Sequence, residues 1–253
     1  MSLYPALVKQ EHRSMSEAAN LTIVIPIYEG VTHLDFTGPH QFFTRVPGAR
    51  VIVASVGARP VTADGLTFAN VADLGAIDHC DVLCVPGGNG CTAAMEDKLY
   101  MSAIRGLAAG ARHITSVCTG SLILGAAGLL EGKRAACHWA WRDLLTLFGA
   151  IPDAGRVLRD GNIITGGGVT AGIDFAMVVM AELAGEEAAQ AVQLMLEYEP
   201  APPFRAGRPE LAPPAVRDLV AARTASAMPA RRAAVARAAE AWRRSTVALA
   251  NAW

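Results

Sequence analysis

No apolar run in this sequence of 253 residues approaches the length of a membrane-spanning helix. Residues 1–20 are polar and charged and lack the apolar core of a secretory signal, so we expect them to form a flexible arm. Net charge is also nearly absent, at −1, whereas hydrophobic residues make up 52% of the chain. These features argue against a membrane partner and predict one large domain, or one domain with an appendage.

The sequence shows neither a disulfide framework nor a zinc motif. Its cysteines number five, an odd count for a large domain, which favours free thiols in a reducing compartment, and we expect a cytoplasmic location. Cys80 and Cys84 have no second pair at ligand spacing, so we interpret both as structural rather than metal-binding. The glycine run at 166–168 lacks the spacing of a dinucleotide site. We therefore expect neither a metal nor an organic cofactor.

Acidic residues are scarce near the C-terminus. Residues 204–253 hold nine arginines against three acidic residues, a net charge of +6 that leaves −7 for the rest of the chain. Such a basic, Ala-rich segment could touch nucleic acid, but it contains no recognisable DNA-binding module. We favour a helix that packs on its own domain or on a partner subunit, and we expect no nucleic-acid partner. The chain thus divides into the arm, a domain at 21–204 and a partly helical extension at 205–253.

Apolar, β-rich segments alternate with segments of helical spacing along residues 21–204. Strands that are apolar on both faces are typical of an open parallel sheet with helices on each side. In such sheets, ligands bind beyond the carboxyl ends of the strands. We expect strands at residues 21–27, 51–56, 81–85, 113–117 and 133–137, hairpins within 60–73 and 157–165, and helices at 35–45, 98–109, 138–148, 169–183 and 186–196.

A cysteine lies at a sharp turn between one of these strands and a helix. Cys118 follows the apolar segment 113–117, and small and apolar residues at helical spacing follow it through Ala127. Gly120 and Ser121 are small enough for a tight turn, which is the pattern of a nucleophile elbow. The N–H groups and dipole of the helix N-terminus favour an anion there, so we expect Cys118 to have a lowered pKa and to be a thiolate. The alternative is a buried cysteine that acts only as a small hydrophobe.

Other groups should meet Cys118 at the same edge of the sheet. Gly88 has no side chain, so its N–H can approach a bound reactant, and the N–H of Thr119 is the usual second donor of such a site. Asp35 opens a helix there, either as a carboxyl with a raised pKa that holds a proton or as a plain N-cap. His138 either pairs with the cysteine or only hydrogen-bonds the backbone.

Three segments carry a resemblance to a known family: VPGG at 85–88, SVCTGSLILGAAGLLEGKRAACHW at 116–139 and TGGGVTAGIDFA at 165–176. Together they resemble the ThiJ/PfpI superfamily, whose members have a flavodoxin-like, glutamine-amidotransferase-like three-layer sandwich around a mostly parallel sheet. The resemblance spans residues 21–204 and implies the same α/β fold and a homodimer. Thr119 stands where the peptidase-like members have histidine, which weakens a protease interpretation.

Within the superfamily, the HLDFTGP segment at 33–39, the Cys-Thr pair and the LEYEPAPPF segment at 196–204 resemble the isonitrile hydratases. The resemblance implies that Asp35, Cys118 and Thr119 add water to an isonitrile, through a Cys118 thioimidate, to give an N-substituted formamide. The alternatives are another thiol enzyme, acting on amides or glyoxals, and a redox or ligand sensor related to the N-terminal domains of AraC-type regulators. Four further residues are expected around the site: Gly87, His138, Gly168 and Thr170.

Overall fold

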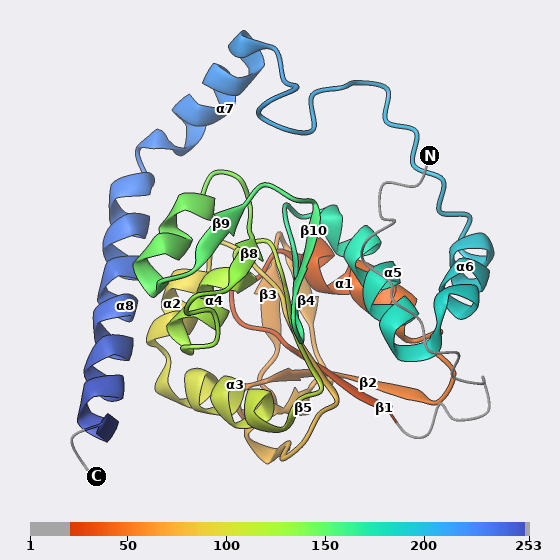
Figure 1. The fold of residues 1–253 in the computed structure, drawn as a ribbon, viewed down its shortest axis with the longest axis horizontal. Helices are drawn as coiled ribbons and strands as arrows, with labels where there is room; N and C mark the ends of the chain where they lie inside the picture. The colour runs from red at the N-terminus through yellow and green to blue at the C-terminus, as the bar shows by residue number, and fades with distance from the viewer. Residues whose placement is uncertain (1–20, 251–253) are drawn as a thin grey trace.

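The computed structural model describes residues 21–250; the expected flexible arm, residues 1–20, lies outside the described residues (Figure 1). Its centre is a seven-stranded sheet. The strands lie side by side in the order β10 (Val157–Asp160), β11 (Ile163–Gly166), β7 (His113–Val117), β6 (Val82–Val85), β1 (Leu21–Pro26), β2 (Ala49–Ser55) and β5 (Ala72–Asp73). Every neighbouring pair is parallel except the hairpin of β10 and β11, as the apolar strands predicted.

Helices cover both faces of this sheet. On one face, α1 (His33–Phe43) packs against α5 (Ala171–Ala184), which also contacts α6 (Glu186–Met195). On the other, α2 (Cys91–Glu96) packs against α3 (Lys98–Gly110) and α4 (Gly120–Ala126), as Figure 1 shows. The predicted three-layer α/β sandwich with a mostly parallel sheet is therefore confirmed. Among residues 21–250, no helix is both long and apolar enough to cross a membrane.

Short strands lie beside the main sheet. β3 (Val61–Ala63) and β4 (Leu66–Phe68) form an antiparallel hairpin inside the range where one was expected. β8 (Arg134–Ala136) pairs in parallel with β9 (Ile151–Asp153). Neither β5 nor β9 nor α2 was predicted, because segments of two, three and six residues are too short to show a clear periodicity.

The helix expected at residues 138–148 is present in part, as a 3₁₀ helix that begins only at Arg142. The Trp141 N–H closes a turn on the His138 carbonyl, and a 3₁₀ helix, Arg142–Phe148, follows it. Gly149, in the left-handed conformation with φ of 71°, ends this helix. The buried residues of the segment recur at a spacing that fits both helix types, so the apolar pattern could not distinguish them.

Two helices lie in the C-terminal extension. α7 (Pro214–Ala225) begins with proline, and none of its residues is buried. α8 (Met228–Ala250) runs along α2, α4 and the 3₁₀ helix, and it is drawn in blue in Figure 1. α8 therefore docks on the sandwich through a narrow strip, whereas α7 stays exposed. The strip consists of the buried side chains Ala234, Val235, Ala238 and Ala239.

Candidate active site

Cys118 lies in a strained backbone conformation between β7 and α4. Its φ of 59° is in the left-handed region, which costs a residue with a side chain on the order of 1–3 kcal/mol. Its N–H donates to the Gly166 carbonyl at 3.0 Å, which ties the turn to β11. Gly120 starts α4 so close to β6 that a Cβ there would lie 2.1 Å from the Val85 carbonyl oxygen. The nucleophile elbow expected from the sequence is therefore present.

The loop after β6 meets the elbow at hydrogen-bond distance. The Gly88 N–H donates to Thr119 Oγ1 at 2.8 Å, and the Thr119 hydroxyl donates to the Gly88 carbonyl at 3.1 Å. The Gly87 N–H donates to Asp35 Oδ2 at 2.9 Å. A Cβ on Gly87 would lie 2.4 Å from the Thr119 nitrogen, so only glycine allows this approach. The Gly88 N–H, expected to face a reactant, already has a partner, and its role toward an adduct stays a prediction.

Asp35 is a buried carboxyl rather than a helix cap. α1 begins at His33 with Thr32 in the N-cap position, so the N-cap interpretation of Asp35 is wrong. Asp35 is 0% exposed, and burial raises its pKa from 3.8 to about 7, although the Gly87 N–H and the Cys118 side chain act to lower it. Its Oδ1 has no hydrogen-bond partner in the part of the chain that the structure describes. Asp35 can therefore hold and release a proton near neutral pH.

The Cys118 thiol and Asp35 lie close enough for each to act on the pKa of the other. Burial, the charge of Asp35 and Cys137 raise the pKa of Cys118 well above its usual value, while the Thr119 N–H lowers it. The expectation of a lowered pKa and a thiolate is wrong for the free protein, because burial and the carboxylate outweigh the helix N-terminus. At neutral pH Cys118 is therefore a thiol, and Asp35, with a pKa of about 7, exchanges between its protonated and ionised forms.

His138 lies beside the site without a hydrogen bond to Cys118 in the described residues. Its Nδ1 accepts the Ala140 N–H at 3.3 Å, which is the backbone contact considered as the alternative. Its ring lies against Gly168, where a Cβ would be 3.7 Å from His138 Cδ2. Thr170 occupies the N-cap position of α5, and its side chain makes no cap hydrogen bond. The structure thus brings together Asp35, Cys118, Thr119 and the two loop glycines, with His138 and Gly168 next to each other.

Tyr28 and Cys91 border the same groups, and no sequence pattern indicated either of them. The Tyr28 hydroxyl donates to the Pro86 carbonyl at 3.0 Å, immediately before the two glycines. Burial raises the pKa of Tyr28 well above its usual value, and the charges of Cys91 and Asp35 add to the effect. Cys91 neighbours Thr119, whose side chain acts to lower the Cys91 pKa. A loop tyrosine and a cysteine at the start of a short helix carry no periodic signal that could have found them.

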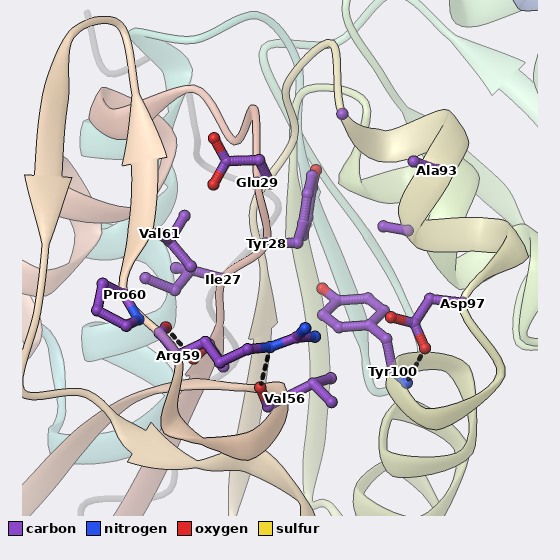
Figure 2. A pocket seen from close by; sticks show the side chains of 13 residues that line it. Ile27, Tyr28, Glu29, Val56, Arg59, Pro60, Val61, Ala93, Asp97 and Tyr100 are labelled. Carbon is purple, nitrogen blue, oxygen red and sulfur yellow. Dashed lines mark hydrogen bonds between the residues drawn. The ribbon is translucent and has the colours of Figure 1, made fainter.

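A cavity of about 370 Å³ lies beside Tyr28 (Figure 2). Tyr28 and Tyr100 meet edge to face in its wall, with ring centroids 5.4 Å apart. Figure 2 shows Arg59 reaching across the cavity, and its Nε donates to the Val56 carbonyl at 3.1 Å. Cys118 is not among the lining residues, so the cavity is not assigned to the reaction. Among residues 21–250, no group of three or more His, Cys, Asp or Glu side chains is placed to hold a metal ion.

The chain matches known proteins over most of its length. The model of the DJ-1/PfpI family matches residues 21–182. The curated isonitrile hydratase of Pseudomonas putida is 49% identical over 220 residues, which are 87% of this chain and 96% of that protein.

Two solved structures cover different shares of this chain. A ThiJ/PfpI family protein from Pseudomonas syringae superposes with a TM-score of 0.82 at 40% identity, and covers 94% of this chain and 99% of its own. Drosophila melanogaster DJ-1beta superposes with a TM-score of 0.64 at 25% identity, and covers 72% of this chain and 100% of its own. More than a quarter of this chain therefore has no counterpart in DJ-1beta.

Proposed function

The chain belongs to the DJ-1/PfpI family, and within that family we propose that it is an isonitrile hydratase, a hydro-lyase that converts an isonitrile and water to an N-substituted formamide. The observation that carries the proposal is the match to the Pseudomonas putida enzyme along nearly the whole of that protein. The geometry supports it independently. A cysteine on an elbow, a buried carboxyl and a threonine (Cys118, Asp35 and Thr119) meet through the loop after β6.

The first step joins the Cys118 sulfur to the terminal carbon of the isonitrile. That carbon accepts both a nucleophile and a proton, so the proton held by Cys118 and Asp35 moves to it as the carbon–sulfur bond forms. The product is a thioimidate, in which the former isonitrile carbon carries one hydrogen, the sulfur and a double bond to nitrogen. Because Asp35 has a pKa of about 7, it can pass this proton at neutral pH and is left ionised.

The second step adds water to the thioimidate carbon. As the water oxygen bonds to carbon, one of its protons passes through Asp35 to the substrate nitrogen. The other proton returns to the Cys118–Asp35 pair when the carbonyl forms and the carbon–sulfur bond breaks, which releases the formamide. Thr119 positions the water. Its hydroxyl donates to the Gly88 carbonyl and accepts the Gly88 N–H, and one lone pair remains to accept a water hydrogen.

Backbone donors complete the proposed machinery. The Thr119 N–H acts on the Cys118 sulfur and lowers its pKa, so it stabilises the thiolate that departs in the second step. The Gly88 N–H would be shared between Thr119 and charge on the adduct. No step requires a metal or an organic cofactor.

The test is incubation with cyclohexyl isocyanide while N-cyclohexylformamide is followed. The native protein should form the formamide and Cys118→Ala should form none. Cys80→Ala is the matched control, since Cys80 is also a fully buried thiol but contacts the Leu107 carbonyl instead. Absence of formamide from the native protein would contradict the function, and formamide from Cys118→Ala would contradict the mechanism.

We also propose that the protein acts as a homodimer in the cytoplasm. Two neighbouring large apolar side chains are exposed at the end of α6: Leu194 is 83% and Met195 70% exposed. Apolar surface of this kind is typical of an interface. All five cysteines are free, which fits a reducing compartment. Sedimentation velocity over a concentration series tests the dimer, and a monomer at every concentration would contradict it.

A further inference from the structure

Arg231, in the first turn of α8, reaches the edge of the active site. Its guanidinium carbon lies 4.6 Å from the centroid of the Trp141 ring, and its Nη2 donates to Asn89 Oδ1 at 2.8 Å. Asn89 directly follows Gly88 in the loop after β6. Trp141 closes the turn that begins at His138. One side chain of the C-terminal extension therefore contacts two segments that border the site.

The charge of Arg231 also reaches groups that lie near those segments. Burial lowers the pKa of His138, and the Arg231 charge lowers it further. Burial raises the pKa of Cys91 to about 11, and Arg231 is among the groups that oppose this. A guanidinium can stack on an aromatic ring and donate a hydrogen bond at the same time, and it keeps its charge at any pH at which the protein is folded.

The remainder of α8 keeps Arg231 in position. Val235, one turn further along, is fully buried. Arg237 pairs with Glu96 of α2 at 2.8 Å, and Arg243 Nη2 donates to the Leu147 carbonyl in the 3₁₀ helix at 2.5 Å. α8 is thus held to the two elements that follow the contact residues of Arg231 in the sequence, which are α2 after Asn89 and the 3₁₀ helix after Trp141.

We propose that Arg231 is a positioning residue of the active site, which holds the loop after β6 against the elbow by linking Asn89 to Trp141. The same loop binds two of the three reacting groups, because Gly87 holds Asp35 and Gly88 holds Thr119. A shift of the loop would therefore move both groups relative to the sulfur. The extension, which belongs to the part of the chain beyond the common fold, becomes part of the catalytic apparatus.

The turnover readout of this proposal rests on the proposed hydratase function, so the experiment adds two readouts that do not. Three variants are compared with the native protein: Arg231→Ala, Arg231→Lys and, as a matched control, Arg232→Ala at the exposed neighbouring arginine. Each is measured for kcat and KM with cyclohexyl isocyanide, for the rate of Cys118 alkylation by iodoacetamide, and for the His138 titration by NMR. Thermal unfolding establishes that each variant is folded.

Arg231→Ala should lower kcat by about 10- to 100-fold with a smaller change in KM, since a small misplacement of reacting groups has an effect of this size. It should also change the alkylation rate and raise the pKa of His138. Arg231→Lys should keep the His138 titration near native, because the charge remains, but restore kcat only in part, because the planar contacts are lost. Arg232→Ala should match the native protein throughout.

Native alkylation and native His138 titration in Arg231→Ala would overturn the proposal. This holds even if the native protein hydrates no isonitrile, because neither measurement needs turnover. Failure of the proposed function and failure of this inference are therefore separate results.

Discussion

The elbow and the C-terminal extension are built in opposite ways. At the elbow, Cys118 is strained, and Gly87 and Gly120 stand where a Cβ would meet backbone atoms at 2.4 and 2.1 Å. In the extension, α7 is exposed, and the α8 pair of Arg237 with Glu96 has side chains that are 61% and 46% exposed. The comparison indicates that close backbone contacts fix the conformation of the elbow and leave no space for a larger side chain. The extension instead contributes through a few side chains, on a helix most of whose other positions could be substituted at little cost.

Adding a methyl group at the elbow should have the largest effect of the changes that test this contrast. Gly120→Ala should destabilise the protein by about 3 kcal/mol or more, or prevent folding. Its Cβ would meet the Val85 carbonyl oxygen, and neither atom can move away without a shift of the backbone. Gly106→Ala, within α3, is the matched control. Nothing lies within 4 Å of its Cβ, so it should stabilise the helix by about 0.5–1 kcal/mol. Urea unfolding of both variants measures the difference, and a native midpoint for Gly120→Ala would break the contrast.

The second test removes the carboxyl charge of Asp35, which lies beside the elbow, and keeps the size of the side chain. Asp35→Asn should lower kcat by about 10²–10⁴-fold, the usual range for a lost general acid and base. It should also change how stability depends on pH. Asp35 has a raised pKa, so between pH 4 and 7 the folded state binds more protons than the unfolded chain, and native stability falls as pH rises through that window.

Asp35→Asn should therefore be more stable than the native protein above pH 7, by roughly 1–4 kcal/mol for a pKa shift of this size. Below pH 4 the difference should vanish, since Asp35 is protonated in both states. Denaturant unfolding at pH 4 and pH 8 measures it. If the native protein and Asp35→Asn were equally stable at both pH values, Asp35 would not be a buried carboxyl with a raised pKa.

The elbow could be predicted from sequence because its signal is local. Cys118, Gly120 and the apolar residues on each side lie within a few positions, and a strand followed by a helix limits how the chain can turn. The titration of Cys118 could not be predicted, because it depends on burial and on Asp35, which a different strand and helix bring to it. The contact of Arg231 with Asn89 joins residues 142 positions apart, which no local pattern describes.

The short elements were beyond prediction for another reason. A helix was expected near Arg142–Phe148, but an α-helix and a 3₁₀ helix would bury nearly the same residues, so periodicity could not give the helix type. At Gly125 of α4, a Cβ would lie 2.6 Å from the Phe148 ring, which shows how closely the two elements approach. Such close contacts depend on the assembled core and not on the segment alone.

The smallest expected effect is a difference in stability between the same substitution in α8 and in α7, the two helices of the extension. Val235→Ala in α8 should cost about 1–3 kcal/mol, because Val235 is 0% exposed and its removal leaves a cavity. Val216→Ala in α7 is the same change at a residue that is 42% exposed, and it should stay within about 0.5 kcal/mol of native. Urea unfolding of both variants provides the comparison, because the volume removed is identical.

Measuring kcat for the same two variants then shows whether the packing of α8 on the sandwich affects catalysis. Because Val235 lies one turn from Arg231, loosening it should lower kcat as well as stability, whereas Val216→Ala should leave kcat unchanged. A loss of stability without any loss of kcat would show that Arg231 keeps its contacts when the helix beneath it is weakened. The stacking on Trp141 and the hydrogen bond to Asn89 would then be sufficient to hold the guanidinium, and the strip of α8 would serve only the fold.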